Sequence, residues 1–368
     1  MSGCFAVVTG GGTSGHVLPA LAIADALVAA GHDPATIHYV GTERGVETTL
    51  VPPTGYGHTL LDVVGLQRSL SRRNLAFLPK LRRAVRAARA LLRELQPQVV
   101  VNVGGYGSFP ATWAARRLGI PYVVVSYDRR PGMVSKLMAA RAAACAVAFP
   151  GSTLPHAELT GAPVRQEIIA VDRVAGRSHA RQELGLPEDR FVLAVMCGSL
   201  GAQVVNEAVS GLVERLAGHS GLAVYHVVGD RFLSQAAPAR DGSEGILYRV
   251  IGYEQKMAAV YAAADLMVTR GGAGTVAEVA TTGMPALMVP WPGAAENHQE
   301  DNVRVLSDVG AAVLIRQPEF STDRLVSEVE RFLADAEALA ALGHAAHVAG
   351  AEHRSGRLVA LVERVAAR

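Results

Sequence analysis

The chain has 368 residues, half of them hydrophobic and only 5% aromatic, so it can bury the cores of two ordinary α/β domains. No apolar run reaches the roughly 18 residues that span a bilayer and no signal peptide is expected, which leaves only peripheral membrane contact. The net charge of +2 conceals a basic part: residues 1–165 hold 17 basic and 8 acidic side chains, which indicates an anionic partner such as nucleic acid, a membrane surface or a phosphorylated substrate.

Apolar strand-like runs alternate with amphipathic helical runs along the whole chain. Strands are expected at residues 4–9, 36–41, 58–63, 98–103, 121–126, 145–149, 191–197, 223–228, 248–251, 266–269, 285–290 and 311–315. Helices are expected at residues 17–30, 75–95, 107–118, 203–216, 256–263, 275–283, 296–308 and 321–336. Such alternation with short loops predicts one parallel sheet in each half, built with right-handed crossovers.

A Gly/Pro break at residues 161–165 marks the expected domain boundary. The first domain would comprise residues 1–163, and the second residues 164–344. The tail, residues 345–368, reads as helix and is expected to pack back onto the first domain.

The first glycine-rich loop, Gly10–His16, lies between an apolar run and an amphipathic run, so backbone N–H groups and a helix dipole can face an anion. The loop also fits the G-x-G-x-x-G dinucleotide fingerprint. A dehydrogenase, however, needs an acidic residue at the end of the second strand, and the first acid, Glu43, comes several residues too late. His16, at the mouth of the loop, is a candidate catalytic residue.

A second glycine-rich loop, Arg270–Gly274, again separates a strand from a helix. Glu278 follows Gly274 by one helical turn, where its carboxylate could accept both hydroxyls of a ribose whose phosphates rest on the loop. The segment Asn297–Asn302 offers amide and imidazole groups that suit sugar hydroxyls. Ser199 follows another strand and is a third candidate phosphate contact, although a plain helix cap explains it nearly as well. Two such loops predict two similar domains that face each other across a cleft around a charged ligand.

No metal centre or disulfide is expected. Cys4, Cys145 and Cys197 lie singly in strand-like runs and read as buried, reduced thiols of a cytoplasmic protein. The sequence contains no D-x-D pair, so a transferase of this kind would stabilise a diphosphate leaving group with backbone dipoles. No cofactor is required by this interpretation, although a divalent metal ion could stimulate turnover.

Residues 66–93 form a basic amphipathic stretch, which is typical of a peripheral membrane surface. For residues 80–95 the alternative is an ordinary helix with an apolar core face and solvated arginines. The residues expected at a membrane surface are Leu70, Leu75, Phe77, Leu78, Arg72, Arg73 and Lys80.

In this order, the motifs resemble the MurG family of GT-B glycosyltransferases, which transfer N-acetylglucosamine (GlcNAc) from UDP-GlcNAc to lipid I in peptidoglycan synthesis. The resemblance covers nearly the whole chain. The motifs that carry it are Gly10–Ala20, Gly41–Glu47, Gly104–Tyr106, Gly161–Arg165, Gly198–Ala202, Thr269–Glu278, His298-Gln299 and Asn302.

The resemblance implies two Rossmann-like domains, with parallel sheets facing across a cleft, at the cytoplasmic face of the cell membrane. The partners would be UDP-GlcNAc, a polyprenyl-diphosphate glycan acceptor (lipid I) and an anionic membrane surface, with no nucleic acid. Gly104, Gly105 and Tyr106 would face the acceptor. The donor would be bound by Thr13, Ser14, Gly15, Arg165, Ser199, Tyr253, Glu254, Ala273, Gly274, Thr275, Glu278, His298, Gln299 and Asn302.

One segment departs from the family pattern. After the fifth strand the family has a His-Glu-x-Asn segment, whereas the run in this chain, Val125-Ser126-Tyr127-Asp128-Arg129-Arg130-Pro131-Gly132, is one residue shorter and has no histidine or glutamate. The catalytic base is therefore either His16 or Asp128. Three alternatives stay open: a related transferase with another polyprenyl or secondary-metabolite acceptor, a UDP-sugar epimerase, and a non-enzymatic sensor of UDP-GlcNAc.

Overall fold

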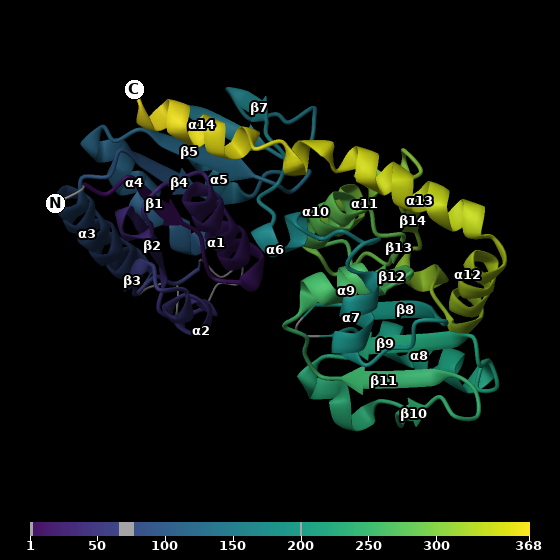
Figure 1. Ribbon diagram of the computed structural model, residues 1–368. Helices are drawn as coiled ribbons and strands as arrows, with labels where there is room; N and C mark the ends of the chain where they lie inside the picture. Colours follow the sequence, from purple (N-terminus) through teal and green to yellow (C-terminus); the bar gives the residue numbers. More distant parts are fainter. Residues whose placement is uncertain (1–2, 66–76, 199–200) are drawn as a thin grey trace. The chain divides into compact units, whose positions relative to one another are not determined.

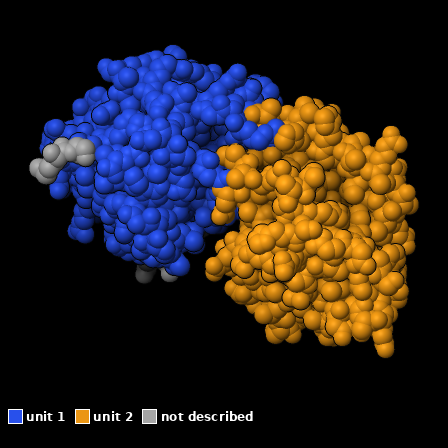
Figure 2. All heavy atoms as spheres, viewed as in Figure 1, with its two compact units in different colours: residues 1–166, 352–368 blue, residues 167–351 orange. Residues whose placement is uncertain are grey.

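The computed structural model describes residues 3–65, 77–198 and 201–368, which form two compact units (Figures 1 and 2). Unit 1 comprises Met1–Gln166 and Glu352–Arg368, and unit 2 comprises Glu167–Ala351. The division therefore falls after residue 166, where the sequence suggested 163. The chain returns to unit 1 at residue 352, where the sequence suggested 345.

Unit 1 is built on a seven-stranded parallel sheet with the order β3-β2-β1-β4-β5-β6-β7. Helices α3, α4 and α5 pack on one face, while α14 contacts β4, β5, β6 and α1. The strands are β1 (Ala6–Thr9), β2 (Ile37–Thr42), β3 (Gly57–Leu61), β4 (Val99–Asn102), β5 (Tyr122–Ser126), β6 (Ala144–Val147) and β7 (Ala157–Leu159). The helices are α1 (Ser14–Ala29), α2 (Glu47–Leu50), α3 (Phe77–Leu95), α4 (Phe109–Leu118), α5 (Met133–Ala139) and α14 (Arg357–Ala366), with α6 (Gln166–Ile169) at the unit boundary.

Unit 2 repeats this plan with the order β10-β11-β9-β8-β12-β13-β14, in which only the edge strand β10 is antiparallel. Helices α8 and α12 share one apolar cluster with the sheet. The strands are β8 (Phe191–Met196), β9 (Leu222–Val227), β10 (Arg240–Asp241), β11 (Leu247–Ile251), β12 (Leu266–Thr269), β13 (Ala286–Met288) and β14 (Val313–Leu314). The helices are α7 (Arg177–Leu184), α8 (Gln203–Arg215), α9 (Met257–Ala263), α10 (Ala273–Thr282), α11 (His298–Ser307), α12 (Thr322–Ala334) and α13 (Ala336–Ala349).

All twelve predicted strands are confirmed to within a few residues, because buried parallel strands leave continuous apolar runs in the sequence. The edge strands β7 and β10 and the short helices α2, α5, α6 and α7 were not predicted, since they are too short to show a period. The prediction of one helical tail is wrong. Helix α13 ends at Ala349 and α14 begins at Arg357, with Gly350 and Gly356 as their flanking residues.

The strand order places the glycine loops at topological switch points, where the connections leave a parallel sheet in opposite directions and ligands bind in α/β folds. In unit 1, β1 and β4 are neighbours, so the loops after Thr9 and Asn102 meet. In unit 2, the neighbours are β8 and β12. The loop Arg270–Gly272 therefore corresponds in topology to the loop after β4, and not to Gly10–Gly12, although both loops are rich in glycine.

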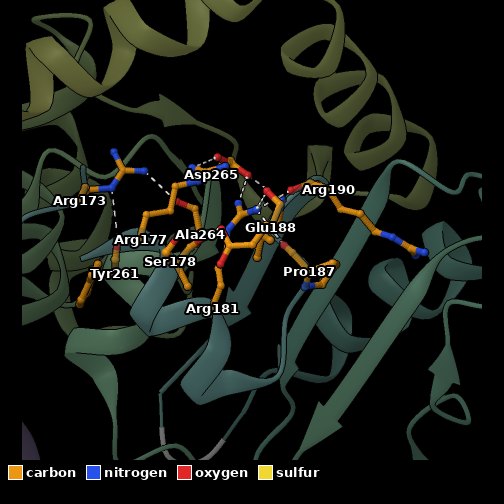
Figure 3. Close-up of polar contacts among 12 residues, drawn as sticks. Arg173, Arg177, Ser178, Arg181, Pro187, Glu188, Arg190, Tyr261, Ala264 and Asp265 are labelled. Atoms are coloured by element: carbon orange, nitrogen blue, oxygen red, sulfur yellow. Dashed lines mark hydrogen bonds and ion pairs between the residues drawn. The ribbon is translucent and has the colours of Figure 1, made fainter. Parts of the chain in front are cut away.

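A buried arginine organises the start of unit 2 (Figure 3). Arg181, which is fully buried, donates to the carboxylate of Asp265 at 2.8 Å and to the carbonyls of Pro187, Glu188, Arg190 and Ala263. Arg173 donates to the carbonyls of Tyr261, Ala264 and Gly283. These contacts fasten the first segment of unit 2 to its sheet, because buried guanidinium groups need several acceptors.

Two of the three cysteines agree with the prediction. Cys145 and Cys197 are buried and unpaired, and burial raises the pKa of their thiols to about 11 and about 12. Cys4 is only half-buried, at a position just before β1. All three are free thiols, as the sequence indicated.

The stability of both units should fall in mild acid because each contains a buried neutral histidine. His353 accepts a hydrogen bond from the Ala162 N–H in unit 1, and His226 lies between Tyr248 and Asn206 in unit 2. Burial lowers their pKa values to about 4 and about 3. The unfolded chain, with an ordinary histidine pKa of about 6.5, binds more protons than the folded chain below that pH. Each histidine should therefore cost up to about 1.4 kcal/mol of stability per pH unit as the pH falls from about 6.5 toward its folded pKa.

The measurement is the urea unfolding midpoint at pH 7 and pH 5. His353→Gln keeps an acceptor for Ala162 but does not titrate, so the variant should lose less stability between these pH values. His219→Gln, at an exposed position, is the matched control and should behave like the parent. An equal pH dependence in all three proteins would contradict the assignment.

Candidate active site

In unit 1, the two loops at the switch point pack directly against each other. The Gly11 N–H donates to the Gly104 carbonyl at 3.3 Å. Gly105 has φ +76°, and a Cβ there would lie 2.1 Å from the Gly11 carbonyl oxygen and 2.8 Å from Cδ2 of His16. The sequence had assigned these glycines to ligand approach, but close loop packing already requires Gly105. Tyr106 packs its ring where a Cβ of Gly12 would be.

Glu47 changes the interpretation of the first glycine loop. This fully buried carboxylate accepts the Gly12 N–H at 2.8 Å and the Thr42 N–H at 3.2 Å through Oε1. Its Oε2 has no hydrogen-bond partner among the described residues. Within the predicted loop Gly10–His16, the N–H groups of Gly11 and Gly12 are therefore occupied by the protein itself and are not available to a phosphate. Thr13, Ser14 and Gly15 stay at the N-terminus of α1, and Thr13 makes no side-chain cap.

His16, in the first turn of α1, contacts the segment that departs from the family pattern. Its Nδ1 lies 2.8 Å from the hydroxyl oxygen of Tyr127, and that hydroxyl donates to the Gly15 carbonyl. Burial lowers the pKa of His16, while the nearby charge of Asp128 opposes the shift. A neutral imidazole beside a carboxylate can accept a proton and then be stabilised as the cation.

In unit 2, two predicted sugar ligands hold the second glycine loop. Oε1 of Gln299 accepts the Gly271 N–H at 3.3 Å and the Trp291 N–H at 2.9 Å. Asn302 is fully buried and donates to the Gly271 carbonyl at 3.3 Å. In this position Asn302 holds the loop, whereas the sequence had predicted a direct contact with a sugar. Only the tertiary contacts reveal this role. His298 begins α11 beside them.

At the N-terminus of α10, three backbone N–H groups are without a partner among the described residues. No hydrogen bond in the described part of the chain engages the N–H groups of Ala273, Gly274 and Thr275. A Cβ at Gly274 would meet no described atom within 4 Å, so protein packing does not require this glycine. On the second turn, Glu278 accepts the Tyr261 hydroxyl at 3.0 Å, which orients its carboxylate.

The other predicted donor contacts are more scattered. The carboxylate of Glu254, after β11, accepts the Tyr225 hydroxyl and the Lys256 N–H, while the Tyr253 side chain is half exposed. Arg165 directly precedes α6 at the end of unit 1. Ser199 lies outside the described residues.

The expected membrane surface is described only from Phe77 onward; Leu70, Arg72, Arg73 and Leu75 lie outside the described residues. Leu78 is 60% exposed, whereas Lys80 pairs at 3.0 Å with Asp62, a carboxylate that it shares with Arg44. Helix α3 buries Ala84, Ala88 and Leu92. Its arginines 82, 83, 86, 89 and 93 are exposed, as the alternative reading of an apolar core face and solvated arginines expected.

Neither a metal cluster nor a membrane-spanning helix is found where the structure describes the chain. The described histidine, cysteine and acidic side chains form no group of three that could hold a metal ion. None of the described helices combines the length and hydropathy needed to cross a bilayer.

The paired Rossmann-like units have the GT-B fold of glycosyltransferases. Residues 6–147 match the N-terminal domain of glycosyltransferase family 28, and residues 192–357 match its C-terminal domain. The chain belongs to this family, as its similarity to full-length relatives also shows.

A relative from a Nocardioides species is 41% identical over 92% of both chains, and one from Desulforudis audaxviator is 36% identical over 98% of both. Each is named UDP-N-acetylglucosamine–N-acetylmuramyl-(pentapeptide) pyrophosphoryl-undecaprenol N-acetylglucosamine transferase. The crystal structure of Acinetobacter baumannii MurG is 26% identical and superimposes with a TM-score of 0.72, covering 98% of this chain and 99% of that one. A Listeria monocytogenes protein described as a UDP-N-acetylglucosamine 2-epimerase shares the fold alone, at 16% identity and a TM-score of 0.67 over 98% of this chain and 96% of that one.

Proposed function

We propose that this glycosyltransferase moves GlcNAc from UDP-GlcNAc to the C4 hydroxyl of the MurNAc residue of lipid I, forming lipid II. The observation that carries the proposal is full-length similarity, at 36–41% identity, to relatives named for this transfer. Unit 2 would bind the donor and unit 1 the acceptor, at the cytoplasmic face of the cell membrane.

The donor nucleotide rests on the N-terminus of α10. The N–H groups of Ala273, Gly274 and Thr275 bind the diphosphate, together with Ser199 and Arg165, and the open side of Gly274 leaves room for it. Glu278, oriented by Tyr261, accepts the ribose hydroxyls. The backbone around Tyr253 and Glu254 reads the uracil.

The GlcNAc moiety is bound beside the second glycine loop. Because Oε1 of Gln299 is used by two backbone N–H groups, its amide nitrogen is the atom left to donate to a sugar hydroxyl. His298 adds an imidazole on the same helix. Asn302 contributes by holding Gly271 in place.

The reaction is an inverting displacement in which the acceptor oxygen attacks the anomeric carbon. His16 takes the hydroxyl proton, the new glycosidic bond forms, and UDP leaves with the electrons of the broken bond. The charge of Asp128 stabilises the imidazolium, and the α10 N-terminus stabilises the departing diphosphate. Thr13, Ser14 and Gly15, at the N-terminus of α1, would add donor contacts, while Gly104, Gly105 and Tyr106 line the acceptor side.

A second candidate differs only in the acceptor. The Ser126–Gly132 segment departs from the family pattern in the region expected to line the acceptor site. This departure favours, as the alternative, another polyprenyl-linked or secondary-metabolite hydroxyl with the same donor and the same chemistry.

The test is an acceptor screen with radiolabelled UDP-GlcNAc. We expect label to move to a lipid I analogue, with one UDP released per transfer. Label appearing only on another polyprenyl glycan would establish the second candidate. Conversion of the donor into an isomeric UDP-sugar would identify an epimerase, and donor binding without UDP release on any acceptor would identify a sensor.

The membrane contact would be made by α3 and α4, which pack together on one face of unit 1. Leu78 and the exposed arginines of α3 supply apolar and basic groups. A groove of about 650 Å³ at the end of α4 is lined by Trp113, Arg116, Arg117 and Arg141 among others, with Arg116 stacked 5.1 Å from the indole centroid. Exposed arginines beside aromatic and aliphatic groups suit an anionic lipid surface.

The protein should therefore co-sediment with vesicles rich in anionic lipid, and less so in high salt. Leu78→Glu combined with Arg86→Glu should weaken vesicle binding about 10-fold or more, since each basic residue near such a surface contributes about 1 kcal/mol. Transfer to a short, water-soluble acceptor should stay unchanged. Leu233→Glu, a matched change at an exposed leucine of unit 2, is the control. A folded double variant that binds vesicles as the parent does would show that α3 is an ordinary solvated helix.

A further inference from the structure

Tyr127 directly follows β5, and its hydroxyl contacts two residues at the start of α1. The hydroxyl donates to the Gly15 carbonyl, and its oxygen lies 2.8 Å from Nδ1 of His16. The two rings meet edge to face with centroids 6.3 Å apart. Only 5% of Tyr127 is exposed, so these contacts are shielded from water.

These contacts decide which nitrogen of His16 carries the proton. A tyrosine hydroxyl has a single proton, and here it is given to the Gly15 carbonyl. The hydroxyl oxygen can then only accept from His16, which favours a proton on Nδ1; the Val103 backbone is a second hydrogen-bond partner of the same ring. In that tautomer the lone pair of the neutral ring is on Nε2.

We propose that Tyr127 is a positioning residue that holds His16 in its Nδ1–H tautomer, with Nε2 available to receive the acceptor proton. The inference rests on the proposed role of His16 as the base. The Ser126–Gly132 segment lacks the histidine and glutamate of the family pattern. In this proposal it orients the catalytic base, His16, and does not itself contain the base. Asp128 and Glu47 are the carboxylates whose charges act on the same ring.

The experiment reads the tautomer directly, by the nitrogen chemical shifts and two-bond couplings of His16 in protein labelled with ¹⁵N-histidine. His16→Ala identifies the signal by its loss. We expect the parent to show the Nδ1–H form, and Tyr127→Phe to shift toward the Nε2–H form that free imidazole side chains prefer. The kcat of Tyr127→Phe should fall about 10- to 100-fold, as for a misplaced catalytic group, with the Kd for UDP-GlcNAc unchanged.

The matched control is Tyr122→Phe, at the start of β5, the strand that Tyr127 follows. It removes an equally buried hydroxyl that donates to the Met138 carbonyl at 2.8 Å and should alter neither the tautomer nor kcat. An Nε2–H signal in the parent, or one tautomer shared by the parent and Tyr127→Phe, would overturn the proposal. The tautomer of His16 in the parent protein can be measured even if the variants do not fold and no acceptor substrate is known. If no acceptor receives GlcNAc, the proposed function fails while the tautomer result still stands.

Discussion

His16→Ala should lower kcat for GlcNAc transfer by about 10²- to 10⁴-fold, the usual contribution of a general base. The Kd for UDP-GlcNAc should hardly change, because the proposed nucleotide contacts are in unit 2. In the parent, kcat should fall as the pH drops through the pKa of His16, since only the neutral ring accepts a proton. Steady-state rates from pH 5 to pH 9, with direct donor titration, measure both quantities.

Asp128→Asn separates the two candidate bases left open by the sequence. The charge of Asp128 raises the pKa of His16 against the effect of burial. Its removal should therefore move the acid limb of the pH profile to lower pH and reduce kcat less than His16→Ala does. If Asp128→Asn abolishes transfer while His16→Ala keeps kcat within a few-fold of the parent, the base is Asp128.

Glu278→Ala should weaken UDP and UDP-GlcNAc binding to the same extent, because both ligands carry the ribose. Two hydrogen bonds to a charged acceptor contribute roughly 2–4 kcal/mol, which corresponds to an increase in Kd of about 30- to 1000-fold. Calorimetry with both ligands is the measurement. An unchanged Kd for UDP would remove Glu278 from the ribose site.

Two variants act as controls for this prediction. Tyr261→Phe removes only the hydroxyl that orients Glu278, so it should raise both Kd values much less than Glu278→Ala does. Gln299→Ala should affect UDP-GlcNAc more than UDP, because this side chain is assigned to the hexose. Equal losses for the two ligands in Gln299→Ala would mean that Gln299 serves only to hold Gly271 and Trp291.

The sequence by itself determined the class of fold. The buried parallel strands leave continuous apolar runs, and the helices between them leave a helical period, so both patterns are readable from neighbouring residues. The same local information located the glycine loops, His16 and Glu278. It also left the choice between His16 and Asp128 open, because a base is defined by what surrounds it.

Tertiary structure alone decided how these groups act. Glu47 accepts a hydrogen bond from the N–H of Gly12, which is 35 residues away in the sequence. Tyr127 contacts His16 at a sequence separation of 111 residues. Asn302, a predicted sugar ligand, donates to the carbonyl of Gly271, which is also a contact between residues distant in the sequence. Local periodicity carries no information about such pairs, since the strand order that makes β1 a neighbour of β4 is set by packing of the whole sheet. The sequence therefore located the loops and their chemistry, while the sheet topology determined which N–H groups, carboxylates and ring nitrogens stay available to a substrate.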